Sequence, residues 1–399
     1  AVTVSDGSGV LDISDTENSQ DVTFSGDVTA VTLTTTANTY DVIFEEDVTV
    51  TNDVTFAAIR NLDIGGATDD IATFTGGLDT ATNVTGTVTI AGTINTTNTQ
   101  MDLGAVTLAA ATTLDTGNAA AGVLNVGAVT SGTNALTLDS GSTSGATIGL
   151  TSFADATGGL TIRDAGGLVT VSGAVGDGAS GDVTITNSQA GVTFGSTVDA
   201  GTLLITDTTG TVTVQGDLTA ATLTTANQDY NVQFDEDATV TADASFLNTG
   251  TVTLGSANDD VLLFNGGINT TGAGTNPSGT TLAGILRTSA DQVDLGAVTL
   301  GANSVIDTTN NSGSASGAAI NLVSVDADDA SGQDRTLTLN SGTGGAIGVS
   351  GAIGSTEALA GLDITNSNGA TFTGAVTVSD GSGVLDISDT ENSQDVTFS

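Results

Sequence analysis

The sequence predicts an all-β chain that folds as a parallel β-solenoid. Three observations lead to this fold class. Short strands with alternating apolar and polar residues recur along the chain, longer motifs of the first half recur in the second, and Ala1–Ser25 recurs unchanged as Ala375–Ser399. Each coil of a solenoid contacts only its neighbours, so such repetition is typical of stacked coils.

The recurring element is a short strand followed by a turn of small residues. Segments such as "DVTFSG", "DVIFEED" and "DVTITNS" alternate β-branched or aromatic residues with polar ones, which is the pattern of a half-buried strand. Gly, Asn, Asp and Ser separate the segments, and these residues favour turns because they tolerate left-handed backbone or hydrogen-bond it locally. No stretch with a helical period lies between them, so we expect strands throughout.

The chain contains two diverged halves. "YDVIFEEDVTVTNDVTF" at Tyr40–Phe56 matches "YNVQFDEDATVTADASF" at Tyr230–Phe246, at an offset of 190 positions. The offset rises to 201 and then falls to 179 for the pairs Leu136–Gly141 with Leu337–Gly342 and Val183–Ser188 with Leu362–Ser367. The first half therefore carries a 22-residue segment that the second half lacks, close to one two-strand coil, and a solenoid can lose a whole coil. We expect coils stacked about 4.8 Å apart.

The alternative fold is a tandem array of immunoglobulin-like sandwiches, each of about half the 190-residue offset. Trp is absent, aromatic residues make up only 3% of the chain, and no stretch of it reads as a linker. These features favour the solenoid over the sandwich array.

The segment "AVTVSDGSGVLDISDTENSQDVTFS" occupies both Ala1–Ser25 and Ala375–Ser399, which defines a full 374-residue period. We divide the chain into a first half-repeat at 1–190, a second half-repeat at 191–374, and the start of the next repeat at 375–399. We expect the two identical segments to form the same strands facing the same sides, related by a shift along the axis with some twist. Both should be cuts that abut another coil, with Gly26 and its successors expected after Ser399.

Composition excludes several classes of function. The chain has 46 acidic residues and four arginines, lacks Lys, His and Cys, and carries a net charge of −42. Such a chain repels nucleic acid and anionic membranes, which are bound through Lys and Arg. Without cysteine there is no disulfide or thiolate metal site. No run of 18 apolar residues is present, so we expect no transmembrane segment.

Three longer phrases carry a resemblance to a known family. They are "VDLGAVTLGANSVIDTTNNSGSASGAAI", "LTLNSGTGGAIGVSGAIGS" and "LDITNSNGATFTGAVTV". Their texture resembles the very large bacterial surface proteins built of β-strand repeats, akin to the shafts of filamentous-haemagglutinin-type and autotransporter-type adhesins. The resemblance covers essentially the whole chain and implies a right-handed β-helix, a secreted location, and a role in adhesion, matrix or a cell-surface fibre.

Clusters of acidic residues are candidate divalent-cation sites. Calcium prefers several carboxylate and carbonyl oxygens at once, and stacked turns can supply them. The alternative interpretation is that solvated acidic turns keep a long fibre soluble. The candidates occur in matching pairs of motifs in the two halves: Glu45, Glu46, Asp47, Asp69, Asp70, Asp235, Glu236, Asp237, Asp259 and Asp260.

Enzyme activity is not expected. No cofactor is expected to be required, and Ca²⁺ is the candidate ion. Some right-handed β-helices cleave pectin with Asp clusters, but a chain of net charge −42 without Lys or His would repel an anionic sugar. No His or Lys can serve as the base for a Ser or Thr nucleophile. Thr-x-Thr triplets such as Thr49–Thr51 can match ice when they form a flat ladder, but the sequence shows no regular spacing at coil intervals.

These observations predict a structural repeat segment of a long extracellular or bacterial cell-surface fibre, stalk or matrix protein: a stiff, acidic rod. Its partners are expected to be further copies of the same repeat in one chain or fibre. The alternative function is an adhesin-type module that recognises glycans, neighbouring cells or ice through its repeat surface.

Overall fold

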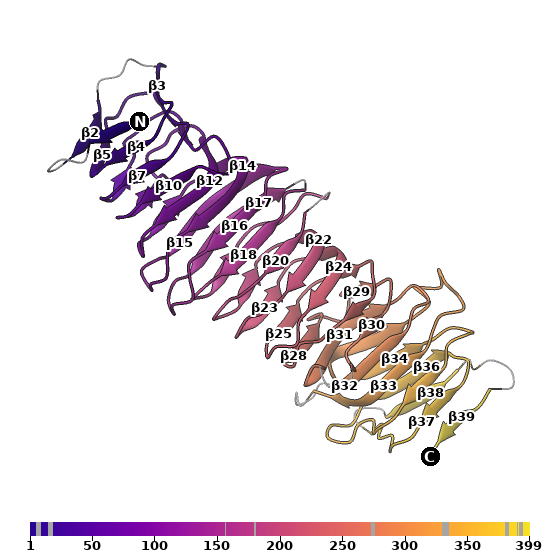
Figure 1. The fold of residues 1–399 in the computed structure, drawn as a ribbon. Coiled ribbons are helices and arrows are strands. Elements are labelled where there is room, and N and C mark those ends of the chain that lie inside the picture. The colour runs from indigo at the N-terminus through magenta and orange to yellow at the C-terminus, as the bar shows by residue number, and fades with distance from the viewer. Residues whose placement is uncertain are drawn as a thin grey trace. The chain divides into compact units, whose positions relative to one another are not determined.

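The computed structural model is an all-β solenoid in which parallel strands stack coil upon coil (Figure 1). It describes residues 1–4, 9–14, 19–155, 157–178, 181–272, 276–328, 335–379, 383–388, 390 and 394–399. Over this part of the chain there are about 16 turns and no helix, and hence no helix that could cross a membrane. The predicted solenoid is therefore confirmed, and the sandwich array is excluded by the parallel pairing.

The chain divides into two compact units. Unit 1 comprises Ala1–Gly201 with Thr206–Gly210, and unit 2 comprises Thr202–Ile205 with Thr211–Ser399. Strand β22 (Val198–Ile205) contributes to both.

Each coil of unit 1 has three sides. Side 1 contains β3 (Asp21–Phe24), β6 (Asp41–Phe44), β9 (Leu62–Ile64) and the first parts of β12 (Val88–Thr96) and β14 (Val106–Asp115). Side 2 contains β1 (Val2–Val4), β4 (Val28–Ala30), β7 (Val48–Val50), β10 (Ile71–Phe74), the last parts of β12 and β14, β16 (Leu136–Asp139), β18 (Leu160–Asp164) and β20 (Val183–Ile185). Side 3 contains β2 (Val10–Ile13), β5 (Thr32–Thr35), β8 (Val54–Thr55), β11 (Leu78–Asp79), β13 (Met101–Leu103), the first parts of β15 (Leu124–Gly132) and β17 (Ile148–Asp155), β19 (Val169–Val171) and β21 (Val192–Phe194).

Unit 2 repeats this plan, and we name each of its sides after the side of unit 1 that carries the matching motifs. Side 1 contains β23 (Thr211–Val214), β25 (Asn231–Phe234), β28 (Thr251–Leu254) and parts of β31 (Gly279–Arg287), β32 (Val293–Asp307) and β33 (Ile320–Ala327). Side 2 contains β24 (Leu218–Thr225), β26 (Ala238–Val240), β29 (Val261–Phe264), the last parts of β31 and β32, β34 (Thr336–Asn340), β36 (Gly361–Asn366) and β38 (Val384–Ile387). Side 3 contains β27 (Ala244–Ser245), β30 (Ile268–Asn269), the first parts of β32 and β33, β35 (Ile347–Val349), β37 (Ala370–Phe372) and β39 (Val396–Phe398).

The interior is a set of apolar ladders running from coil to coil. On side 2 of unit 1, one ladder joins the buried residues Ile94, Leu114, Leu138, Ile162 and Ile185. The strands keep period-two alternation, so their neighbours in sequence point outward. Coil length varies, because the paired residues lie between 18 positions apart (Val88 and Val106) and 33 positions apart (Ser304 and Leu337).

The length difference between the halves is one coil. On side 3 of unit 1, the ladder that starts at Met101 runs through β13, β15, β17, β19 and β21. The matching ladder of unit 2 starts at Val293 and has four members, in β32, β33, β35 and β37, before it reaches β39 of the repeated end segment. The missing 22-residue segment thus corresponds to a complete turn of the solenoid.

Two of the three strands of the repeated segment form in both copies, which confirms the prediction for that part of it. β2 and β3 correspond to β38 and β39, and in place of β1 the second copy has β-bridges at Val376 and Val378. Leu11 and Leu385 both pair with buried leucines, so the same side chains turn inward in both copies. β3 pairs with β6 within unit 1 and β39 pairs with β37 within unit 2, and the relation of the two copies by a shift along the axis stays a prediction.

Candidate functional site

The predicted acidic motifs come together on one edge of each unit. In unit 1, the turn Glu45–Asp47 joins β6 to β7, and the turn with Asp69 and Asp70 joins β9 to β10. Because β6 pairs with β9 and β7 pairs with β10, these turns lie on adjacent coils. The arrangement recurs in unit 2 for Asp235–Asp237 and Asp259–Asp260. We call these four turns the acidic edge.

Several carboxylates of the acidic edge stabilise the backbone of the turns. Asp70 Oδ2 accepts the N–H groups of Gly66 at 2.6 Å and Ala67 at 2.8 Å, and Asp47 Oδ1 accepts the N–H of Ile71 at 2.7 Å. In unit 2, Asp260 and Asp237 make the equivalent bonds, to Ser256, Ala257 and Val261. Asp70 and Asp260 are also mostly buried, at 8% and 6% exposure. These four aspartates therefore have a structural role in both halves.

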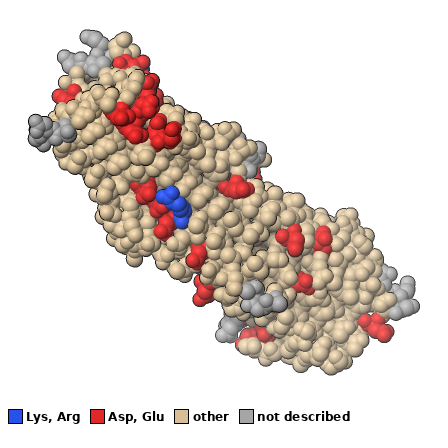
Figure 2. Space-filling view, viewed as in Figure 1, with Lys and Arg blue, Asp and Glu red and all other residues tan. Residues whose placement is uncertain are grey.

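The other acidic residues of the edge, including Glu45, Glu46 and Asp69, are largely exposed. Like charges crowd together here: the carboxylate of Asp260, more than any other cause, raises the pKa of Glu236. Figure 2 shows acidic groups scattered over the face drawn, with the largest group over the first strands of unit 1. Within the described ranges, no three acidic residues come close enough together to hold a metal ion. Specific Ca²⁺ binding stays a prediction.

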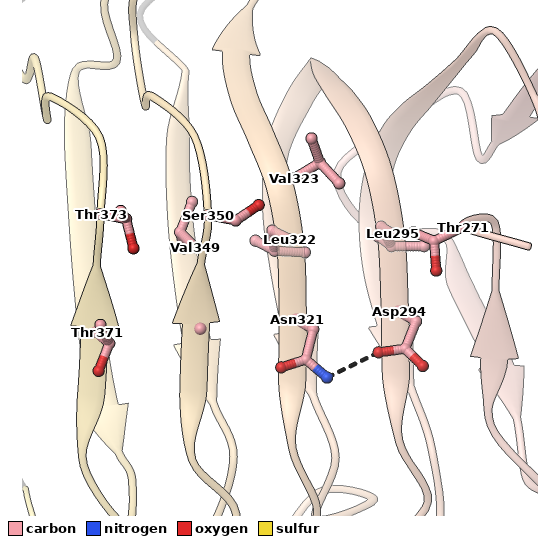
Figure 3. A pocket seen from close by; sticks show the side chains of 11 residues that line it. Thr271, Asp294, Leu295, Asn321, Leu322, Val323, Val349, Ser350, Thr371 and Thr373 are labelled. Atoms are coloured by element: carbon pink, nitrogen blue, oxygen red, sulfur yellow. Dashed lines mark hydrogen bonds between the residues drawn. The ribbon is translucent and has the colours of Figure 1, made fainter. Parts of the chain in front are cut away.

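A second feature, a shallow groove on side 3, occurs in both units. In unit 2 its outward ladder is Asp294, Asn321, Gly348 and Thr371, on four successive coils (Figure 3). In unit 1 the ladder is Asp102, Asn125, Gly149 and Thr170, with the same residue types in the same order, and the last three of these line the hollow. The hollows have volumes of about 320 Å³ in unit 2 and 440 Å³ in unit 1.

Hydrogen bonds fix the first two rungs of the groove. Asn321 donates to Asp294 at 2.7 Å (Figure 3). Gln292 donates to both oxygens of Asp294 at 2.7 and 2.8 Å. In unit 1, Asn125 and Gln100 each donate to Asp102 at 2.6 Å. The same Gln–Asp–Asn group is thus built twice.

Glycine forms the hollow at the third rung. A Cβ on Gly348 would lie 3.2 Å from Asn321 Oδ1, and a Cβ on Gly149 would lie 3.2 Å from Asn125 Oδ1. The absence of a side chain leaves this amide oxygen accessible beside the carboxylate and the next threonine hydroxyl. Such a row of planar acceptors and hydroxyls can bind a ligand that offers several O–H donors.

Sequence reasoning did not single out this groove. Its amide residues looked like ordinary turn or strand residues, and only stacking places Asn125 over Asp102, 23 positions earlier. One signal was present: "QMDLGAVTL" at Gln100–Leu108 and "QVDLGAVTL" at Gln292–Leu300 share both the glutamine and the aspartate.

Threonine also forms a ladder that sequence reasoning missed. Five successive coils of unit 1 carry Thr at one outward position on side 2: Thr93, Thr113, Thr137, Thr161 and Thr184. The spacing between adjacent members changes along the ladder, so no fixed period marks it in the sequence. It is one residue wide, unlike the flat Thr-x-Thr ladder considered for ice.

Three of the four arginines pair with aspartates on preceding or following coils, and Arg335 pairs with Asp328, seven positions earlier in the chain. Arg60 donates from Nε and Nη2 to the two oxygens of Asp41, both at 2.6 Å, and this hydrogen bonding lowers the pKa of Asp41. Arg163 contacts Asp115 and Asp139 of the two preceding coils. Every arginine has an acidic partner, so none is left as a free basic site.

No known protein family, curated protein or solved structure matches this chain.

Proposed function

We propose that this chain is a structural repeat segment of a long extracellular fibre, stalk or matrix protein at a bacterial cell surface. The observation that carries the proposal is the behaviour of the duplicated segment. One copy packs against the coil that follows it, and the other against the coil that precedes it, with the same strands. A segment that accepts a coil on either edge can lie within an indefinitely repeated stack.

The mechanism of such a segment is mechanical. Parallel backbone hydrogen bonds run from coil to coil, and the apolar ladders inside exclude water along the axis. Since each coil depends on its neighbours alone, length scales with the number of coils. The whole-coil difference between the two halves is one instance of such a change in length. The acidic surface opposes lateral aggregation through self-repulsion.

The test joins the 374-residue period in tandem. Chains with one, two and three periods, each followed by residues 375–399, are imaged by negative-stain electron microscopy. We expect the particle length to rise by a constant increment per period at constant width. Compact particles that widen with added periods would contradict a fibre role. Labelling intact cells of the source organism with an antibody against the chain tests the surface location.

The groove favours glycan recognition as a second candidate function. Carbohydrates offer rows of O–H donors, which match the Asp, Asn and Thr acceptors present in both units. We expect Gly149→Val together with Gly348→Val, which fill both hollows, to abolish binding on a glycan array, while the control Ile71→Thr, at an exposed position on side 2, retains it. An array on which the parent chain binds nothing would remove this candidate.

A further inference from the structure

The outward ladder on side 3 of unit 1 continues beyond the groove. Asp102, the first rung of the groove ladder, pairs with Asp79 on the preceding coil, and Asp79 pairs with Thr55 one coil earlier. A second hollow, of about 240 Å³, lies at these rungs and is lined by Asp53, Asp79 and Asp102 among others. Two carboxylates on paired strands therefore stand directly before the amide, glycine and threonine rungs of the groove.

In the described part of the chain, the hydrogen-bond partners of these two carboxylates are neutral. Asp102 accepts from the side-chain amides of Asn125 and Gln100, each at 2.6 Å, and Asp79 accepts the N–H of Ala81 at 2.8 Å. Each arginine is paired with another aspartate, and the chain has no lysine or histidine. Like charges on paired strands repel, and an ionised carboxylate has about four acceptor sites. The pair therefore has acceptor sites left for a cation, and binding one relieves the repulsion.

Unit 2 has the same ladder with one carboxylate fewer. Asn269 takes the place of Asp79, and it pairs with Asp294 as Asp79 pairs with Asp102. Asn269 Oδ1 accepts the N–H of Thr271 at 2.6 Å, and Asp79 accepts the equivalent bond from the residue two positions later. The two units therefore differ in charge at this rung while the backbone arrangement is the same.

We propose that the side 3 groove binds a cationic polysaccharide whose sugars carry free amino groups. The protonated amines bind the carboxylates of Asp79 and Asp102 through charge-assisted hydrogen bonds, and the sugar hydroxyls bind the rungs beyond them. Coils are about 4.8 Å apart, and a sugar in an extended β-linked chain advances by a similar length, so each coil contacts about one sugar. The inference rests on the glycan recognition proposed above and names the class of glycan.

The lining beyond the carboxylates favours a sugar over a basic peptide. Amide and hydroxyl groups line the hollow of unit 1, at Asn125, Thr151, Thr170 and Ser172. Such groups both donate to and accept from sugar hydroxyls, and Gly149 leaves room for a sugar to reach them. A basic peptide would satisfy the carboxylates, but its backbone has no hydroxyl groups for the remaining rungs.

Two oligosaccharides with the same backbone test the inference. A chitosan oligomer has free amino groups, and the chitin oligomer of the same length has them acetylated and uncharged. Each is titrated into the chain of residues 1–399 by isothermal titration calorimetry, at mildly acidic pH where the free amino groups are protonated. We expect the chitosan oligomer to bind at least about tenfold more tightly, with an affinity that falls as salt is added.

Single substitutions exchange the charge between the units. Gly348→Val closes the groove of unit 2, so that unit 1 is measured alone, and Gly149→Val does the reverse. On the first background, Asp79→Asn should weaken binding of the chitosan oligomer about tenfold, and on the second, Asn269→Asp should strengthen it by about the same factor. Each substitution introduces the residue that the other unit already has at this rung, so both variants should fold.

The matched control removes one charge from the same coil outside the groove. Asp69 is exposed and precedes β10 on the acidic edge, so Asp69→Asn should leave the affinity unchanged. An oligolysine of equal charge measures attraction by net charge alone. It should bind more weakly than the chitosan oligomer, and Asp79→Asn should affect its binding no more than Asp69→Asn does.

Three results would contradict the inference in different ways. Equal binding of oligolysine, or equal losses for Asp69→Asn and Asp79→Asn, would show that net charge alone attracts the ligand and would overturn it. A neutral glycan that binds as tightly as the chitosan oligomer would overturn the cationic specificity and leave glycan recognition standing. If no glycan binds, both the inference and glycan recognition are wrong.

Discussion

Ile13 and Ile387 occupy the same position in two identical segments, yet Ile13 is 6% exposed and Ile387 is 37% exposed. Both lie in strands that pair in parallel with a neighbouring coil. Ile13 lies against the coil of β5, and its carbonyl accepts a hydrogen bond from Tyr40, whereas Ile387 pairs with Ile364 of the preceding coil. The comparison shows that sequence sets which side chains turn inward, while the neighbouring coil sets how completely they are buried.

The largest difference in stability should come from replacing two phenylalanines, Phe44 and Phe398, each of which is the last residue of its strand. Phe44 is covered on both edges, between Phe24 and Ile64, and is 1% exposed, while Phe398 stacks on Phe372 alone and is 48% exposed. We expect Phe44→Ala to cost about 3–5 kcal/mol and Phe398→Ala about 1 kcal/mol or less. Urea denaturation, monitored by amide hydrogen exchange in the affected coils, measures the free-energy cost of each substitution. Equal costs would break the comparison.

Isoleucine gives a smaller difference at identical sequence. Ile13→Ala should destabilise its coil by about 2 kcal/mol, because a nearly buried side chain leaves a cavity, and Ile387→Ala by about 0.5 kcal/mol. Amide exchange at residues 10–13 and 384–387 reports the two coils separately. Intrinsic exchange rates are the same in both, since the sequences are identical, so any difference is structural.

The sequence was sufficient for the fold class, because period-two alternation and the whole-coil difference between the halves do not depend on tertiary detail. It was also sufficient to pair Glu45–Asp47 with its counterpart in the second half. It did not reveal that Asp70 accepts hydrogen bonds from the backbone of its own turn, or that Asn321 lies next to Asp294 on the following coil. The second of these joins residues on different coils, and because coil length varies along the chain, cross-coil neighbours have no fixed spacing.

The dependence of stability on pH tests the pKa shifts of the carboxyl groups between the coils. Burial raises the pKa of three carboxyl groups, those of Asp63, Asp164 and Asp363. Their folded forms bind protons more tightly than their unfolded forms, so stability should increase as pH falls from neutral through the raised values towards 3.8. Hydrogen bonds from arginine lower the pKa of Asp41 and Asp328, whose contribution is present above 3.8 and lost as pH falls through the lowered values.

The melting temperature should therefore pass through a maximum at mildly acidic pH. Replacing Arg60 by Gln should weaken the decline on the acidic side of that maximum, because Asp41 loses its partner. Thermal unfolding followed by circular dichroism from pH 3 to pH 8 measures the profile. A melting temperature that falls steadily from pH 7 downward would contradict the assigned shifts.

The smallest difference in stability concerns Asp12 and Asp386, which occupy the same position in the two copies of the repeated segment. Asp12 accepts a hydrogen bond from Thr34 at 2.8 Å, whereas its counterpart Asp386 pairs with Asp363, and burial followed by the Asp386 charge raises the pKa of Asp363. Asp386→Asn should stabilise its coil by about 0.5 kcal/mol, because like charges on paired strands repel. Asp12→Asn keeps an acceptor for Thr34 and should change little. Slower amide exchange at residues 384–387, but not at 10–13, is the expected readout.

The most direct test of the account measures coil stacking within unit 1. Spin labels on cysteines at Thr93 and Thr161, and at Thr93 and Thr184, span three and four coils of one ladder. Pulsed electron paramagnetic resonance should give mean distances that differ by about 4.8 Å, the second near 19 Å, because each coil adds one inter-strand spacing. Distances that do not grow with the number of coils between the labels would contradict the parallel solenoid.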